Sequence, residues 1–152
     1  SAIFNAVLAR RVADGTWNRL RAGDVANLDG SNSIFSVDAL DEVLTERCRL
    51  LDIHPSGPLW GRGVSKSQGE VAELEQQVAA SEALLADALG KAGTEQERRA
   101  LRLRVSNVEW ALEADQLRLK FRLPRGAFAT AVLHELLGNA FAQSLPEAGE
   151  EA

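Results

Sequence analysis

Three basic residues, Arg118, Lys120 and Arg122, alternate with apolar residues in the stretch 117–123. On a β-strand, alternate residues share a face and lie ~6.6 Å apart, because the rise is ~3.3 Å per residue. Such a row of cations can bind successive phosphates of an extended RNA strand. Three or four phosphate contacts give only weak, salt-sensitive binding that does not depend on base sequence. The alternative is a solvated strand face that binds nothing.

Phe128 follows this strand, after a turn at residues 124–126, and begins a stretch with helical apolar spacing. An aromatic ring next to basic side chains can stack on an unpaired base, with a contribution of ~1–3 kcal/mol. The same helix start presents unpaired backbone N–H groups to an anion. Phe128 also forms an i, i+4, i+8 row with Val132 and Leu136, so packing of the helix on a sheet is the alternative.

Other site chemistries find little support in the residue types present. Cys48 is the only cysteine and is accompanied by just two histidines, His54 and His134, so we expect no metal site and no internal disulfide. Residues 61–67 lack the Gly-Lys-Ser/Thr order of a phosphate-binding loop. His54 precedes a proline in a loop, where a structural hydrogen bond is expected. The sequence therefore predicts no metal site and no nucleotide-binding loop.

The composition is that of a globular domain, with 152 residues, 45% hydrophobic and 26% charged, and a net charge of -5. This acidity argues against a protein that coats nucleic acid through a broad basic surface. No apolar run approaches the ~20 residues that cross a bilayer, and no signal peptide is recognisable, so we expect no membrane contact and a cytoplasmic location. The lack of methionine and the start within an amphipathic pattern favour a cut from something longer.

Periodicity and capping signals predict the elements that hold these residues. Apolar spacing predicts helices over residues 3–14, 40–48 and 70–89 and from 94 onward, the second capped by Ser36 or Asp38. Capping boxes at 67–70 and 94–97 are expected to open the last two, which form an antiparallel pair. Two β-prone pieces, 24–28 and 33–37, predict a small hairpin. Residues 52–69, rich in Pro and Gly, are expected to form a loop pinned by Trp60.

From Val108 the period changes to two, which predicts a longer antiparallel hairpin up to Leu123, followed by a helix from Phe128. After Phe141 the chain is acidic and lacks an apolar stripe, so a mobile tail is expected over 142–152. The predicted fold class is α+β, with helices and a small hairpin first, then the longer hairpin and the final helix.

Several blocks in order resemble the C-terminal portion of the TruD family of tRNA pseudouridine synthases, from Ser1 to about Leu137: SAIFNAVLARRV, GDVANLDGS with FSVDAL, DIHPSGPLWGRG and LPRGAFATAVLHEL. The Gly-x-Phe-Ala-Thr element at 126–130 is the most diagnostic piece. The resemblance implies a cofactor-free enzyme that converts uridine 13 of tRNA to pseudouridine, with the aromatic of that element in the pocket for the flipped base. The expected substrate-binding residues are Phe128, Gly126, Arg118, Lys120 and Arg122.

The family's catalytic aspartate belongs to a Lys-Asp element, and this sequence contains none. The resemblance therefore implies a chain with no catalytic residue of its own, inactive alone. It also implies a domain division: residues 1–105 as part of an inserted domain, 106–141 as strands and helix of the catalytic sheet, and 142–152 as tail. The apolar strand face of Leu117, Leu119, Phe121 and Leu123 would lack sheet neighbours and can drive self-association. Two alternatives stay open: a standalone RNA-binding or adaptor module, and a purely structural dimer domain.

Overall fold

A computed structural model describes residues 1–138 of the chain. The chain divides into two compact units, residues 1–102 and residues from 103 onward, here named the sheet unit and the hairpin unit. Each is described by itself. Both contain helices and antiparallel strands, so the predicted α+β class is confirmed. The predicted mobile tail over 142–152 lies outside the described residues.

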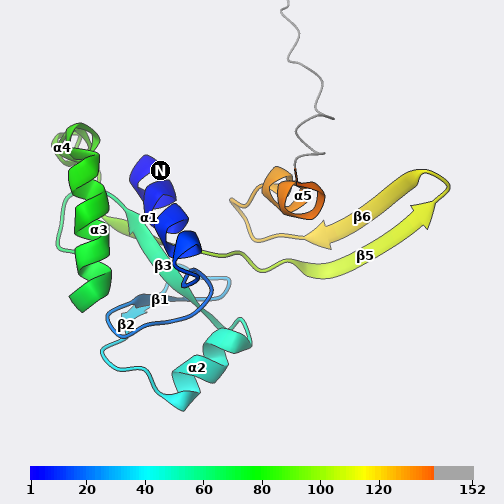
Figure 1. Ribbon diagram of the computed structural model, residues 1–152, viewed down its shortest axis with the longest axis horizontal. Coiled ribbons are helices and arrows are strands. Elements are labelled where there is room, and N and C mark those ends of the chain that lie inside the picture. The colour runs from blue at the N-terminus through cyan, green and yellow to red at the C-terminus, as the bar shows by residue number, and fades with distance from the viewer. Residues whose placement is uncertain (139–152) are drawn as a thin grey trace, which may run out of the picture. The chain divides into compact units, whose positions relative to one another are not determined.

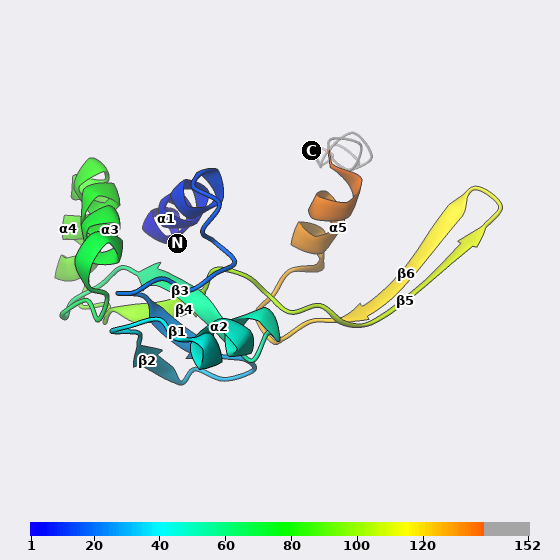
Figure 2. The same cartoon turned by 60° about the horizontal axis from the view of Figure 1, so that its bottom comes forward.

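The sheet unit is built on a four-stranded antiparallel sheet with the strand order β2-β1-β3-β4. Its strands are β1 (Val25–Leu28), β2 (Ile34–Ser36), β3 (Ile53–Leu59) and β4 (Glu97–Ala100). Its helices are α1 (Ala2–Ala13), α2 (Glu42–Arg49), α3 (Gly69–Ser81) and α4 (Ala83–Lys91). Figures 1 and 2 show α1 and α3 side by side along the sheet, and these two helices are in contact.

The core of this unit forms where helices cover the two central strands. One buried cluster joins β1 and β3 to α2, and it consists of Leu20, Ala26, Val37, Cys48 and Ile53. On α1, the buried residues Ile3, Phe4 and Val7 recur at helical spacing. Gly57 of β3 permits this approach, because a Cβ there would lie 2.9 Å from Leu101 and 3.2 Å from the Phe4 ring. The glycine is therefore a packing requirement.

The first helix and the small hairpin agree with the sequence predictions. β1 and β2 pair antiparallel around the turn that contains Asp29 and Gly30, and Gly30 has φ +68°. The second helix starts later than expected. Asp41, rather than Ser36 or Asp38, is its N-cap, and the Asp41 carboxylate accepts a hydrogen bond from the Leu44 N–H at 2.7 Å.

The prediction of a loop over residues 52–69 is wrong for its first half, where β3 forms despite two prolines. β1 pairs with residues 53–55 and β4 pairs with residues 56–59, so the two neighbours engage different halves of β3. Pro55 pairs with β1 and Pro58 with β4. A proline is tolerated in a strand where no ladder partner needs its missing N–H. The strand ends at Leu59, and Trp60 is half-buried just beyond it.

The prediction of a helix from residue 94 is also wrong, since residues 97–100 form the edge strand β4. Tertiary contacts override the capping-box pattern here. Arg98 donates to the Ser56 carbonyl of β3 at 2.6 Å and to both carboxylate oxygens of Glu75 on α3 at 2.9 Å. Ser67 donates to Glu75 at 2.7 Å rather than capping α3, whose N-cap is Gln68. The Thr94 box likewise caps no helix.

The long helix expected over residues 70–89 is two helices that meet at Glu82. Glu82 has φ -112° and ψ 35°, outside the helical region, and its N–H donates to the Ala79 carbonyl. The expected antiparallel helix pair is therefore absent from the described residues. The element after α4 is a strand.

Two further polar networks stabilise the sheet unit. Arg11 at the end of α1 forms a buried bidentate pair with Asp24, with N–O distances of 2.7 and 3.1 Å. The Arg102 guanidinium donates from Nε to His54 Nδ1 at 2.9 Å and from its other nitrogens to three backbone carbonyls. His54 Nδ1 accepts, so the neutral ring carries its hydrogen on Nε2 and donates to Asp29 at 2.7 Å. His54 therefore has a structural hydrogen-bonding role.

The hairpin unit contains β5 (Ser106–Glu113), β6 (Gln116–Arg122) and α5 (Ala129–Leu137). The strict alternation of apolar and polar residues predicts this hairpin, and the structure confirms it. A two-residue connection at 114–115 joins the strands, and Ala114 has φ +54° there. The register places Glu109 opposite Lys120 and Trp110 opposite Leu119. The two side-chain faces of the hairpin thus differ sharply in polarity.

Candidate functional site

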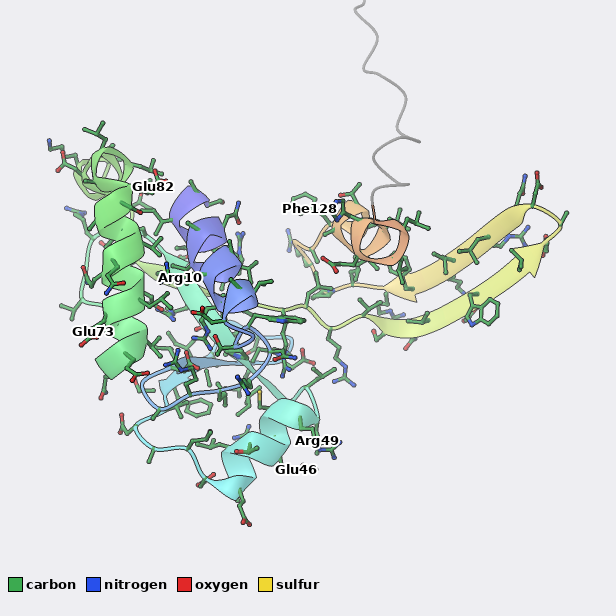
Figure 3. All side chains as sticks on the ribbon, in the orientation of Figure 1. Arg10, Glu46, Arg49, Glu73, Glu82 and Phe128 are labelled. Atoms are coloured by element: carbon green, nitrogen blue, oxygen red, sulfur yellow. The ribbon has the colours of Figure 1, made fainter. Side chains whose placement is uncertain are left out.

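Phe128 stands at the N-cap of α5 and its side chain is 73% exposed. Figure 3 labels Phe128 at the start of α5. Its backbone is extended, with φ -109° and ψ 124°, and its side chain makes no capping hydrogen bond to the helix. Leu136, in the same helical row, is also exposed, and Val132 is half-buried. Within the hairpin unit the ring is therefore open to a ligand rather than packed in a core.

The turn before Phe128 requires a glycine. The Ala127 N–H donates to the Pro124 carbonyl at 3.2 Å, and Gly126, the third residue of this turn, has φ +86°. This positive φ is what a type II turn demands of its third residue. A Cβ at Gly126 would meet nothing within 4 Å. Gly126 thus contributes backbone geometry that directs the chain into α5.

Arg118, Lys120 and Arg122 lie on one face of β6, as their spacing predicts, but two of them are paired with carboxylates of β5. Arg118 donates to Glu113 at 3.2 Å and Lys120 to Glu109 at 3.1 Å. Arg122 has no side-chain partner among the described residues, since only its backbone carbonyl accepts a bond, from Ser106. The basic row is therefore largely neutralised by the neighbouring strand.

The opposite face of the hairpin is apolar and exposed. Trp110 is 71% exposed, and the face also includes Val108, Leu112 and Leu117, each about half exposed or more. A two-stranded hairpin has no second layer to cover such a face. The expectation that this face lacks sheet neighbours describes the hairpin unit as it stands, whereas self-association stays a prediction.

Sequence reasoning missed one basic residue of this region. Arg125 lies in the turn, is exposed, and has no carboxylate partner among residues 1–138. The signal was available, because residues 116–134 contain no Asp or Glu in a chain that has 22 acidic residues. The unpaired cations next to Phe128 are thus Arg122 and Arg125.

The exposed ring and the unpaired cations can bind a nucleobase and its flanking phosphates. A stacked ring contributes ~1–3 kcal/mol, and cations at the turn can neutralise phosphates. Glu109 and Glu113, the acidic residues of β5, are both held in ion pairs. No Lys-Asp pair occurs anywhere in the sequence. The described part of the hairpin unit therefore has features of a binding surface.

The sheet unit adds no second candidate among the described residues. Two surface depressions of this unit, of about 400 and 450 Å³, lie beside α2 and at the start of α3. The second is lined by Arg21, Glu70, Asp38 and Gln68, which already bond to one another in pairs. No group of three or more His, Cys, Asp or Glu side chains in residues 1–138 could hold a metal ion. None of the described helices is long and apolar enough to span a bilayer.

Comparison with known proteins gives a consistent result. Residues 1–136 match the family model for tRNA pseudouridine synthase D (TruD). The tRNA pseudouridine synthase D of Nitrosococcus oceani is 46% identical over 137 residues, which are 89% of this chain and 38% of that protein. The one from Xanthomonas euvesicatoria pv. vesicatoria is 49% identical over 140 residues, which are 90% of this chain and 38% of the relative. The chain thus spans less than two-fifths of the length of these relatives.

A solved structure agrees at the level of the fold. A crystal structure from Methanosarcina mazei, assigned as tRNA pseudouridine synthase D, superposes with a TM-score of 0.67 at 23% sequence identity. The match covers 88% of this chain and 35% of that one. At this identity the likeness concerns the fold alone.

Proposed function

Since this chain belongs to the TruD family of tRNA pseudouridine synthases, we propose that it forms part of an enzyme that isomerises uridine 13 of tRNA to pseudouridine. The observation that carries the proposal is the family match over residues 1–136. The identity of 46–49% with relatives that bear this name supports the same reaction. A cytoplasmic location is part of the proposal.

The chain contributes a scaffold and a binding surface, while the catalytic aspartate comes from sequence outside it. The matched relatives are more than twice as long as this chain, which leaves room for a Lys-Asp element elsewhere. In this assignment residues 1–105 are part of the inserted domain and residues 106–141 complete the catalytic sheet. The chain alone is then inactive, because it can bind a base and cannot start the chemistry.

The reaction is an isomerisation that needs no redox partner or cofactor. The bond from ribose C1′ to uracil N1 breaks and a bond from C1′ to C5 forms, while C5 loses its proton and N1 gains one. Between these steps the detached uracil must turn without escaping. An exposed ring at Phe128 suits this need, since stacking on a π-face holds a base without fixing its in-plane orientation.

A chimera tests the proposal, because it restores the absent portion from a relative. The 137 matched residues of the Nitrosococcus oceani protein are replaced by those of this chain. The substrate is a tRNA transcript with tritium at C5 of uridine, and pseudouridine formation releases the tritium. The chimera is expected to release tritium, and the isolated 152-residue chain is expected to release none. A chimera that folds and binds tRNA but releases no tritium contradicts the proposal and favours a binding module.

Phe128→Ala in the chimera measures the role of the ring. Loss of a stacking contribution of ~1–3 kcal/mol predicts a fall in kcat/KM of roughly 5- to 150-fold. Leu136→Ala is the matched control, since Leu136 is an exposed apolar residue of the same helix, 60% accessible. Equal falls in kcat/KM for the two variants would mean that Phe128 is not part of the binding surface.

A further inference from the structure

The four cations of residues 116–134 fall into two classes in the structure. Arg118 and Lys120 lie in the body of the hairpin and pair across the strands with Glu113 and Glu109 at 3.2 and 3.1 Å. Arg122 and Arg125 lie at the end of β6 and in the turn that follows, with no carboxylate partner in the described part of the chain. The strand spacing alone would group Arg122 with the first class, whereas its environment places it with Arg125.

The cross-strand pairs cancel charge without locking the side chains. All four paired side chains are more than half exposed, and such pairs contribute only ~0–1 kcal/mol of stability. Their effect on a ligand is different. A phosphate that approaches a paired cation also approaches a carboxylate, so the attraction and the repulsion largely cancel. Salt screens what is left of the attraction at distances beyond ~10 Å. Only an unpaired cation presents its full charge.

The unpaired cations are also the ones close to the exposed ring. Three residues span at most about 11 Å, so the Arg125 Cα lies within that distance of both the Arg122 and the Phe128 Cα atoms. The turn between them is closed by the bond from Ala127 to Pro124. A base stacked on Phe128 would therefore have its flanking phosphates within reach of two long, flexible guanidinium side chains.

We propose that Arg122 and Arg125 bind the phosphates that flank a base stacked on Phe128, an inference that rests on the proposed function. Arg118 and Lys120 contribute little, because Glu113 and Glu109 neutralise them. Contact with tRNA is thus concentrated at the turn before α5 rather than spread along β6. Arg125, which the spacing of the basic row does not include, becomes a binding residue.

The test compares variants that change the net charge equally. Arg122→Gln and Arg125→Gln are compared with Arg118→Gln and Lys120→Gln in the 152-residue chain; each removes one positive charge from an exposed position. The probes are a tRNA transcript and a single-stranded oligouridine, with dissociation constants measured by fluorescence anisotropy at several salt concentrations. Far-UV circular dichroism checks that each variant is folded.

The logarithm of the association constant falls linearly with the logarithm of the salt concentration. With the single strand, each of the two turn variants should make this slope shallower by roughly 0.7, the value for one phosphate contact. The two hairpin variants should change it by less than half as much. Glu113→Gln, which frees Arg118, should steepen the slope by a similar amount. Equal losses in all four cation variants would mean that only net charge matters and would overturn this inference while leaving the proposed function intact. A parent chain that binds neither probe at low salt would overturn the inference, whereas the chimera decides the proposed function separately.

Discussion

Glu75→Ala is expected to destabilise the sheet unit by about 3–5 kcal/mol. The side chains of Arg98 and Glu75 are 3% and 2% exposed, so removal of the carboxylate leaves a guanidinium charge that water cannot reach. An uncompensated buried charge costs ~3–5 kcal/mol. Ser67 also loses its carboxylate acceptor at 2.7 Å, and a hydrogen bond to a charged group contributes ~1.5–3 kcal/mol. Domains are typically stable by only ~5–15 kcal/mol, so the variant should be close to unfolding.

Urea unfolding followed by far-UV circular dichroism measures the loss. With a slope of ~1–3 kcal/mol per molar urea, the midpoint should fall by about 1 M or more. Glu73→Ala is the matched control, because Glu73 is exposed on the same helix and the helix-propensity change is identical (Figure 3). It should stay within ~0.5 kcal/mol of the parent. Equal midpoints for the two variants would refute the reasoning that the ion pair is buried.

A double variant separates the cost of the stranded charge from the value of the pair. Glu75→Leu combined with Arg98→Met removes both charges and keeps apolar volume in the site. Replacement of a buried ion pair by apolar residues is often neutral or stabilising. The double variant should therefore be more stable than Glu75→Ala, and a double variant that is less stable would mean that the pair is strongly favourable in itself.

Three further outcomes are expected. Gly23→Ala should lower the urea midpoint far more than Gly30→Ala. Both positions have positive φ, which costs ~1–2 kcal/mol for alanine, but only at Gly23 would a Cβ lie 2.2 Å from a backbone carbonyl oxygen. Equal losses of stability in the two variants would contradict this. Arg102→Gln should lower the unfolding free energy by ~2 kcal/mol or more, because a histidine nitrogen and three carbonyls lose a charged donor; an unchanged midpoint would count against it. The hydrogen bond from Arg49 lowers the pKa of Glu46. This pair's contribution to stability is therefore complete above the ordinary carboxyl pKa and is lost as the pH falls through the lowered pKa. An NMR titration should find that Arg49→Gln returns the Glu46 pKa to its ordinary value.

The elements that the sequence predicts correctly are those that a local periodicity specifies by itself. The hairpin of β5 and β6 follows from an alternation that is strict over residues 117–123, and α1 from an apolar stripe that ends before Gly15. In both elements, the apolar residues that set the periodicity share one face. The family resemblance adds the identity of the scaffold, which no periodicity supplies.

The elements that it misses depend on contacts between distant residues. β3 contains two prolines and a glycine, residue types that are typical of a loop. It forms a strand because β1 and β4 pair with its two halves separately. β4 reads as a helix start, and it becomes a strand because Arg98 reaches Glu75 from the sheet edge. One clue was local: Glu75 stands four residues from the buried residues Val71 and Ala79, a charge within an apolar row. Such a charge requires a buried partner.

The candidate site shows the same division between what a strand's own pattern can reveal and what its partner decides. Alternation correctly places Arg118 and Lys120 on one face, but a strand's pattern says nothing of the charges opposite. Those depend on register, and here a two-residue connection at 114–115 sets it, with Glu109 opposite Lys120. This register puts Glu109 directly opposite Lys120 and leaves Glu113 diagonal to Arg118 on the same face. The charge that stays available to a ligand then lies at the end of the ladder and in the turn that leads to Phe128, because Arg122 stands opposite the uncharged Ser106 and no strand residue stands opposite Arg125.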